Sequence, residues 1–505
     1  MRPLFCLFLS SLALAAPTPT LEQRIHASLL AQILGTLMGF QFEHKTASVQ
    51  RIEALPNASL KAAPVDDDYF YELVALRAFE RYGPQLTIDQ LALQWRENNA
   101  GTWGSSKHTR LNLEKGIPAA EAGSPRYNPM WFSIGPQFSS DIYGLLAPGR
   151  PNLAAHLAHR LAAINGHAEG LDGGVFIAGM VSLAFVESNP QRVVEGAAQL
   201  IAKGSPYREC LDDVIRQARA GRTFREVAEA VERRWHREYP ATNNAVANGG
   251  LVAASVWFGR GDLLDTLNLA FSAGDFTDAD CNAANAGAVV GAMRGLSAIP
   301  DNLRDALHDR IAGDKLGDLL VRPPVDERIS DLARRIAEQV PKIAVAHPDL
   351  LNRKPQPLPL QRFRLSDLTK WWNPEWRLER AGFGGGGGGM AGLRGATYLD
   401  GDVLVTWPED EARGLLLRRT LPPTNAATLS LEVRADPARH WQLEIYWGNQ
   451  RLIAKLIDQT WQTVTVPIPA ATQPTDLRLY QRINLTGNHL AGSAHWRHLQ
   501  LLTAP

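Results

Sequence analysis

The sequence predicts a multidomain protein in which an all-α domain precedes an antiparallel β-sandwich. From about residue 21 to residue 343, apolar residues recur every three or four positions, as in the run from 175 to 185, which is typical of packed helices. No convincing run of alternating strand residues occurs there. Prolines within 355–359 then remove backbone donors and favour an extended linker. We therefore place the helical domain at residues 21–349 and a Pro-rich linker at residues 350–364.

Beyond the linker the apolar period changes from 3.6 to 2. Apolar residues alternate with polar ones in 429–433, 441–447 and 464–468, and turn residues separate these runs. This pattern predicts a β-sandwich over residues 365–505 that resembles galactose-binding-like carbohydrate modules, and it includes a glycine-rich loop at 384–389. Four tryptophans of this region have two interpretations, a sugar-stacking platform or core packing. We expect core packing, because two of the four share strand parity with buried aliphatic residues. The platform would consist of Trp441, Trp447, Trp461 and Trp496.

The amino-terminal residues 1–16 have the layout of a cleavable secretory signal. One early arginine precedes an apolar run, and small residues at Ala13 and Ala15 suit a cleavage site. The run is too short to span a bilayer comfortably, so we expect a secreted or periplasmic protein without a membrane anchor after cleavage. Cleavage would leave Cys210 and Cys281, too few for a disulfide scaffold, and an apolar core must then carry the stability.

The balance of charged residues limits the classes of binding partner that the sequence indicates. The 505 residues contain 52 Lys and Arg and 52 Asp and Glu, which gives a formal net charge of zero. This balance gives no indication of binding to nucleic acid or to an anionic membrane surface.

One acidic cluster lies at the start of the segment 273–295. Asp278 and Asp280 stand two residues apart before a probable helix, where a turn can aim both carboxylates at one point. Paired hard oxygen ligands suit Mg²⁺, Mn²⁺ or Ca²⁺ better than zinc. The helix that follows has glycines every fourth residue from Gly287 to Gly295 among many alanines, so it must be wedged closely between other helices. The alternative is an Asp cap on a tightly packed core helix.

A second acidic cluster, Asp66, Asp67 and Asp68, precedes another helical pattern. A favourable helix dipole is worth only about 0.3–1 kcal/mol for each charge, too little to explain three adjacent carboxylates. A divalent cation would neutralise their repulsion. The alternative is a helix start that carries more acidic residues than capping and the helix dipole require. If both clusters meet in one core, they can hold a pair of metal ions. His44, His108 and His167 show no metal-like spacing.

Several motifs in order resemble the ADP-ribosylglycohydrolase family, whose fold is that of the dinitrogenase-reductase-activating glycohydrolase. The resemblance covers roughly residues 21 to 300. The matching segments are Gly35–Glu43 (GTLMGFQFE), Asp66-Asp67-Asp68, Gly116-Ile117-Pro118, Ser133–Pro151 (SIGPQFSSDIYGLLAPGRP), Asp172-Gly173-Gly174 and Asp278-Ala279-Asp280-Cys281-Asn282.

The resemblance implies an all-α hydrolase with two Mg²⁺ ions, for which Mn²⁺ is a substitute. It implies metal ligation by Asp66, Asp67, Asp68, Asp278, Asp280 and Cys281, although a thiol is a poor ligand for Mg²⁺ and Asn282 or water can replace it. Glu43 and Asp67 are the implied catalytic residues, with Glu43 as the base that activates water. The implied substrate-binding residues are Gly135, Gln137, Asp141, Asp172, Gly173 and Asn244; for Asn244, helix capping is the favoured alternative.

These observations predict a Mg²⁺-dependent glycohydrolase acting on an ADP-ribosyl or related ribosyl bond. Two metals can grip ribose hydroxyls beside the anomeric carbon, and a carboxylate can take the proton of water. One alternative is a glycosidase or nucleoside hydrolase for another extracellular sugar substrate. Another is a binding protein without catalysis, prompted by Thr36 in place of a family aspartate and by Cys281. The substrate is a small molecule or glycoside, and the carboxy-terminal domain is a candidate for carbohydrate binding.

Overall fold

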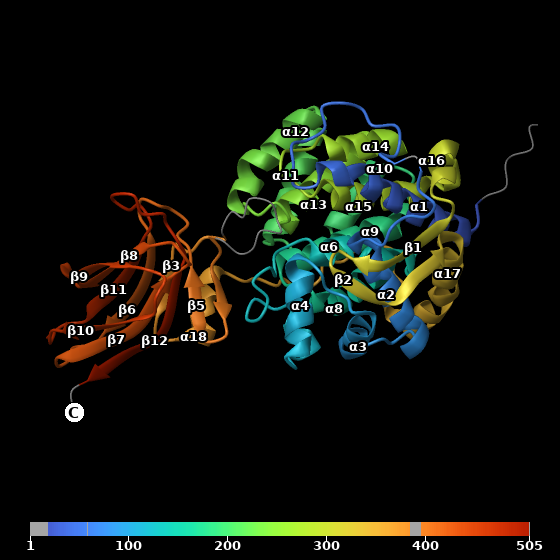
Figure 1. Cartoon of the computed structure of the whole chain (residues 1–505). Helices are drawn as coiled ribbons and strands as arrows, with labels where there is room; N and C mark the ends of the chain where they lie inside the picture. The colour runs from blue at the N-terminus through green and yellow to red at the C-terminus, as the bar shows by residue number, and fades with distance from the viewer. Residues whose placement is uncertain (1–18, 58, 384–394, 504–505) are drawn as a thin grey trace, which may run out of the picture.

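A computed structural model describes residues 19–57, 59–383 and 395–503. The expected signal peptide, residues 1–16, and the glycine run 384–389 lie outside this part of the chain. Figure 1 shows the helical domain and the β-sandwich as two bodies joined by the linker.

The helical domain is built around the long apolar helices α1, α9, α13 and α15. Its helices are α1 (Leu21–Gly39), α2 (Asp67–Tyr82), α3 (Ile88–Asn98), α4 (Gly104–Glu114), α5 (Ala119–Ala122), α6 (Gly135–Phe138), α7 (Asp141–Leu145), α8 (Pro151–Leu161), α9 (Glu169–Ala184), α10 (Pro190–Ala198), α11 (Pro206–Arg219), α12 (Phe224–Val231), α13 (Ala245–Gly259), α14 (Leu263–Phe271), α15 (Ala279–Arg294), α16 (Asp301–Ala306) and α17 (Ile329–Ala346). This arrangement confirms the predicted helical domain. Residues 21–42 have the length and hydropathy of a membrane span, but 72% of that apolar window is buried inside the domain, as in a core helix.

Helices α1 and α15 make the closest contact in the domain, because their interface has almost no side chains. A Cβ atom added at Gly287 would lie 2.9 Å from the carbonyl carbon of Ala31 and would clash with its oxygen. At Gly39 an added Cβ would lie 2.6 Å from the Cα of Asp280. The backbones therefore touch directly, which confirms that the glycine-rich helix is wedged into the core.

A β-hairpin within the helical domain corrects the expectation that no strands precede the linker. Strand β1 (Arg310–Leu316) pairs with β2 (Leu319–Arg328) in antiparallel register, and the hairpin lies near α2 and α17 in Figure 1. Pro323 and Pro324 obscure the strand pattern of β2, because prolines are rarely compatible with a paired strand. The hairpin also bonds the segment before α2: Ala63 donates to the carbonyl of Arg310, at 2.8 Å.

The carboxy-terminal region is the predicted sandwich. In the part of the chain that the structure describes, it has one sheet in the order β10-β7-β12-β5-β4 and another in the order β3-β6-β11-β8-β9. The strands are β3 (Arg377–Glu379), β4 (Tyr398–Asp400), β5 (Val403–Thr406), β6 (Leu415–Leu421), β7 (Ala427–Ala435), β8 (Trp441–Trp447), β9 (Gln450–Ile457), β10 (Gln462–Ile468), β11 (Thr475–Arg482) and β12 (Ala494–Thr503).

The tryptophans of the sandwich mostly fill its core. Trp441 and Trp496 are fully buried, and Trp447 is 7% exposed. The indole N–H of Trp441 donates to the carbonyl of Arg434, and that of Trp496 donates to Thr406. Core packing is thus confirmed for these three, and they cannot form a sugar platform.

The linker follows the surface of the helical domain and ends at an aromatic cluster between the two domains. The Leu358 N–H donates to the carbonyl of Leu200, at 2.9 Å. Further along, Phe363 packs edge-on against Trp131 of the helical domain, with ring centroids 5.1 Å apart. The short helix α18 (Thr369–Trp372) then leads into the sandwich.

We predict that Gly287→Ala destabilises the helical domain by about 1–3 kcal/mol, because the added methyl group must push α1 away from α15. The measurement is the free energy of unfolding in a denaturant titration. The matched control is Gly196→Ala in α10, where an added Cβ meets only a flexible methyl group of Leu183. There the gain in helix propensity, about 1 kcal/mol, opposes a cheap side-chain shift. Equal loss of stability in both variants would contradict the close-packing argument.

Candidate functional site

Both acidic clusters line one cavity of about 440 Å³ in the helical domain. Its walls come from the end of α1, the start of α2, the start of α4 and the start of α15. Asp66 and Asp67 lie on one side, and Asp278 and Asp280 lie on the other. More than two hundred positions separate the clusters in sequence, and the packing of α15 on α1 brings them together. The predicted convergence of the two clusters is therefore confirmed.

At the start of α2, only one of the three aspartates acts as a helix cap. Asp66 is the N-cap residue, and its carboxylate accepts a hydrogen bond from the Asp68 N–H at 3.1 Å. Asp68 is fully buried and accepts a hydrogen bond from the Thr36 hydroxyl of α1 at 2.8 Å. Asp67 faces the cavity. Capping therefore explains Asp66 but not its two neighbours.

At the start of α15, the carboxylate of Asp278 makes no capping hydrogen bond although the residue occupies the N-cap position. Instead the side-chain oxygen of Asn248 accepts hydrogen bonds from the Asp278 N–H, at 3.1 Å, and from the Asn282 amide, at 2.8 Å. This leaves the Asp278 carboxylate available to a ligand. One carboxylate oxygen of Asp280 is buried without a hydrogen-bond partner among the described residues. The simple helix-cap alternative does not account for either side chain.

Glu43 and its neighbour His44 also line the cavity, beside the aspartates. They follow α1, and the His44 N–H donates to the carbonyl of Thr277 at 2.9 Å, which ties this turn to the start of α15. The His44 Nε2 atom lies 3.3 Å from Glu43 Oε1 and 3.8 Å from Asp278 Oδ2. Ligand atoms of Glu43, His44 and Asp278 lie within 4.8 Å of one another, as do those of Asp278, Asp280 and Cys281. Asp278 belongs to both groups, so the two groups are adjacent.

The electrostatics of the cavity favour a bound cation. Burial, followed by the nearby charges of Asp278 and Asp66, raises the pKa of Glu43 to about 8. Burial likewise raises the pKa of Asp66 to about 6 and, together with neighbouring carboxylates, raises the pKa values of Asp67 and Asp280. No lysine or arginine is among the described residues that line the cavity. A divalent cation would relieve this repulsion, and the unpaired oxygen of Asp280 is suited to it.

Cys281 contributes differently from the carboxylates. Its thiol is buried, and burial and the charges of Asp278 and Asp68 raise its pKa. The thiol therefore stays protonated, and it lies within hydrogen-bond reach of the Asp68 carboxylate. Ligation of a metal by Cys281 stays a prediction, and a protonated thiol is a poor partner for a hard cation.

The expected substrate residues divide into two groups. Gly135 lines the cavity. The other five do not, and each has a structural contact. Gln137 accepts a hydrogen bond from the Tyr207 hydroxyl at 2.9 Å and lies against Gly173. Asp141 accepts a hydrogen bond from Asn285 at 2.6 Å, and Asp172 accepts one from Ser205 at 2.5 Å. Asn244 caps α13 by accepting a hydrogen bond from the Ala247 N–H at 2.8 Å. Helix capping, the favoured alternative for Asn244, is thus confirmed.

Sequence reasoning missed several residues of the cavity, including Trp103, Ser105 and His44. His44 has no metal-like spacing to another histidine, and its only signal was its position directly after Glu43. Asn243 lines the cavity with a buried side-chain oxygen that has no partner among the described residues. Its capping neighbour, Asn244, concealed it.

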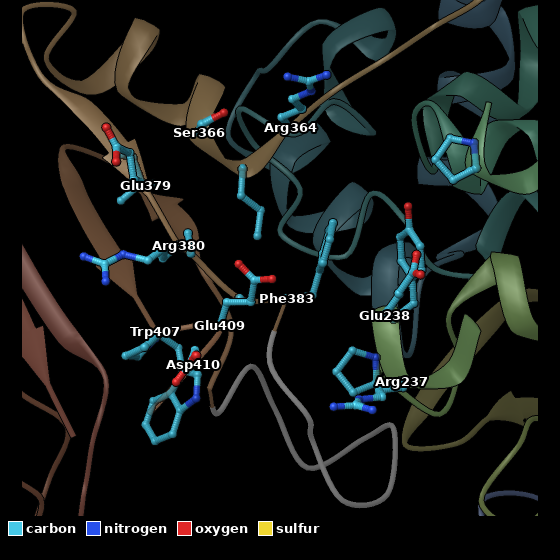
Figure 2. A pocket seen from close by; sticks show the side chains of 18 of the residues that line it. Arg237, Glu238, Arg364, Ser366, Glu379, Arg380, Phe383, Trp407, Glu409 and Asp410 are labelled. Atoms are coloured by element: carbon cyan, nitrogen blue, oxygen red, sulfur yellow. The ribbon is translucent and has the colours of Figure 1, made fainter. Parts of the chain in front are cut away.

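A larger cavity of about 1290 Å³ lies between the two domains (Figure 2). Figure 2 shows Phe383 near its middle, Arg237 and Glu238 on the helical side, and Arg380 and Trp407 on the sandwich side. Some of its charges are paired: Arg413 contacts Asp410 at 2.9 Å, and Arg234 lies 3.6 Å from Glu238. This cavity has mixed charges and no cluster of carboxylates, so we assign the candidate chemistry to the smaller cavity.

Solved structures that are similar to this chain include the following three. One, described as "ADP-ribosylglycohydrolase-related protein complex", is 18% identical with a TM-score of 0.44 and covers 63% of this chain and 99% of its own. Another, described as "CBM4 structure and function", is 12% identical with a TM-score of 0.19 and covers 26% of this chain and 89% of its own. The secreted serine protease VesC from Vibrio cholerae is 13% identical with a TM-score of 0.17 and covers 20% of this chain and 22% of its own. These similarities are too weak to carry an argument.

No curated protein matches this chain. The model of one protein family, ADP-ribosylglycohydrolase, matches residues 17–342. That match spans well over half of the chain, includes both aspartate clusters and Glu43, and ends within α17. The chain therefore belongs to the ADP-ribosylglycohydrolase family, and its helical domain is that of a glycohydrolase.

Proposed function

We propose that the protein is a metal-dependent glycohydrolase that cleaves an ADP-ribosyl or related ribosyl bond with two Mg²⁺ ions, for which Mn²⁺ can substitute. The observation that carries the proposal is the meeting of two aspartate clusters in one cavity with no lysine or arginine among the described residues that line it. Asp66, Asp67, Asp278 and Asp280 would hold the ions, since hard oxygen donors suit both metals. When bound, the metals would supply Lewis-acid polarisation and lower the pKa of water.

Glu43 is the proposed base. It lines the cavity next to Asp278, and it is only partly exposed. In the proposed reaction a water oxygen attacks the anomeric carbon, its proton passes to Glu43, and the leaving group departs with the bonding electron pair. The charge that develops on the sugar is positive, and the surrounding carboxylates favour it.

The start of α4 favours a substrate that carries phosphate. The residue before this helix, Trp103, makes no side-chain cap, so the first N–H groups of α4 are available on the cavity wall at Gly104 and Ser105. Ser105 adds a buried hydroxyl without a partner among the described residues. A helix start of this kind is suited to an anion. This supports an ADP-ribosyl substrate over an uncharged glycoside.

We predict that Asp278→Asn and Asp280→Asn each weaken Mn²⁺ binding at least tenfold, because each removes a charged oxygen ligand. Isothermal titration of the metal-free protein with Mn²⁺ measures this, and release of ADP-ribose from a model substrate follows activity. Asp172→Asn, a half-buried acid outside the cavity, is the control and should bind Mn²⁺ like the wild type. Mn²⁺ affinity equal to that of the wild type in both cavity variants would refute the proposed centre.

We predict that Glu43→Gln lowers turnover at least a hundredfold, because the amide cannot accept the proton of water. Mn²⁺ affinity should fall less than in the aspartate variants. Metal-dependent turnover that depends on Glu43 would also exclude the alternative of a binding protein without catalysis. Equal turnover in Glu43→Gln and the wild type would remove Glu43 as the base.

The rival substrate class is another extracellular glycoside or nucleoside. Screening released sugars from a glycan and nucleoside panel, beside ADP-ribosyl substrates, separates the two classes. Turnover of neutral glycosides alone would favour the rival, whereas dependence on the diphosphate would favour the ADP-ribosyl bond. Secretion or periplasmic export is also proposed, from the sequence of residues 1–16; the amino terminus of the mature protein should begin at Ala16 or Pro17.

We also propose that the carboxy-terminal domain binds carbohydrate through the cavity between the domains. Trp407 is partly exposed on its wall, near Glu409 and Asp410, and an aromatic face with flanking polar groups is suited to a sugar ring. Of the four tryptophans of the expected platform, Trp441, Trp447 and Trp496 are buried, so Trp461 is the competing position from that set.

We predict that Trp407→Ala weakens binding of the full chain to an oligosaccharide from a glycan array at least tenfold. Titration calorimetry with the best array ligand measures the change. Trp461→Ala is the matched control, because its ring is half-buried on another face and stacks with Arg434 and Arg497. Loss of binding in Trp461→Ala alone would place the sugar on the sandwich face instead.

A further inference from the structure

A buried polar layer lies one helical turn below the aspartates of the cavity. Asp68, Cys281 and Thr36 come from α2, α15 and α1, and four positions from each of them the same helices carry a second set of polar residues. These are Glu72 of α2, Asn285 of α15 and Gln32 of α1, and Asp141 at the start of α7 joins them. All four are at most 3% exposed. Burial of four polar side chains is costly unless they satisfy one another.

The hydrogen bonds of this layer connect the helices that carry the cavity. The Gln32 amide donates to the Glu72 carboxyl at 2.6 Å and to the Asp68 carbonyl at 3.0 Å. On the other side, the Asn285 amide donates to the Asp141 carboxylate at 2.6 Å. Glu72 and Asp141 face each other within hydrogen-bond reach. The chain of contacts thus runs from α1 through α2 and α7 to α15.

The contact between two carboxyl groups requires a proton. The remaining oxygens, Glu72 Oε2 and Asp141 Oδ1, have no donor among the described residues. If both groups were ionised, two charges would face each other out of reach of water. If one group is protonated, its O–H donates to the other, and both oxygens are satisfied. Gln32 and Asn285 then hold the outer oxygens of the pair.

We propose that Glu72 and Asp141 share one proton and, with Gln32 and Asn285, act as positioning residues that fix α1, α2 and α15 beneath the metal-binding carboxylates. This rests on the proposed function, because it concerns the same metal centre. Gln32 holds the Asp68 backbone directly, and Thr36, one turn further along α1, holds the Asp68 carboxylate. Loss of the layer would let α2 rotate or shift relative to α15, and the two aspartate clusters would no longer point at one shared metal site.

The test compares Glu72→Gln with Glu72→Met. Gln keeps an acceptor for Gln32 and offers an N–H to Asp141, so it imitates the protonated acid. Met has a similar volume but removes both contacts. We expect Mn²⁺ affinity within about threefold of the wild type for Glu72→Gln and at least tenfold weaker for Glu72→Met, measured by titration of metal-free protein whose folding is verified by circular dichroism.

Thermal unfolding of the metal-free proteins separates positioning from stability. Asp172→Asn alters a half-buried acid that accepts a hydrogen bond from Ser205 outside the cavity, so any change in its melting temperature should come without weaker Mn²⁺ binding. If Glu72→Met does not fold, Asn285→Leu is the second variant, and it should likewise weaken Mn²⁺ binding.

The outcomes are distinct. A wild type that binds no Mn²⁺ would overturn the proposed function itself. A wild type that binds Mn²⁺, together with a folded Glu72→Met or Asn285→Leu of equal affinity, would overturn only the positioning role. Equal loss of affinity in Glu72→Gln and Glu72→Met would overturn the shared proton.

Discussion

Direct backbone contact between α1 and α15 is the constraint on which the site depends. Gly35 and Gly39 on α1 and Gly287 on α15 let the two helices approach more closely than any side chain would permit. The end of α1 then lies beside the start of α15, so the turn after α1 brings Glu43 and His44 to Asp278. Dispersion contacts over two closely packed backbones are individually weak but numerous. These contacts keep the carboxylates of Glu43 and Asp278 close together, although their negative charges repel each other.

The start of α2, which carries Asp66 and Asp67, is positioned by a different contact. The β1–β2 hairpin pairs with Ala63, three residues before the Asp66 cap, and so fixes where α2 begins. Its turn residue Gly317 also lines the cavity, next to Trp103. The earlier part of the chain between Glu43 and α2 is held by α14, where the Phe271 carbonyl accepts a hydrogen bond from the Ser48 N–H at 2.8 Å, whereas the hairpin holds the part next to α2. The hairpin therefore positions one aspartate cluster as α1 positions the other.

Sequence patterns predicted what depends on local composition. The two aspartate clusters, the glycine-rich helix and the change of period near residue 365 are visible in the chain itself, and they gave the fold class and the convergence of the clusters. The hairpin was missed because prolines in β2 hide its alternation. His44 and the contact of Glu72 with Asp141 were missed for another reason. Their importance comes from neighbours on other helices, and no spacing along the chain records it.

The cavity combines a fixed floor with a changeable wall. Asp278 and Asp280 belong to a helix whose glycines allow no larger side chain, so their positions tolerate little change. Another part of the lining is formed by Phe40, Trp103 and Gly317, which come from a helix end, a loop and a hairpin turn. Such segments accept substitutions without disturbing a packed core. In the proposed enzyme, metal-dependent hydrolysis and substrate choice would therefore be controlled by different parts of the fold, and a substitution in the changeable wall would alter the leaving group while the carboxylates stay in place.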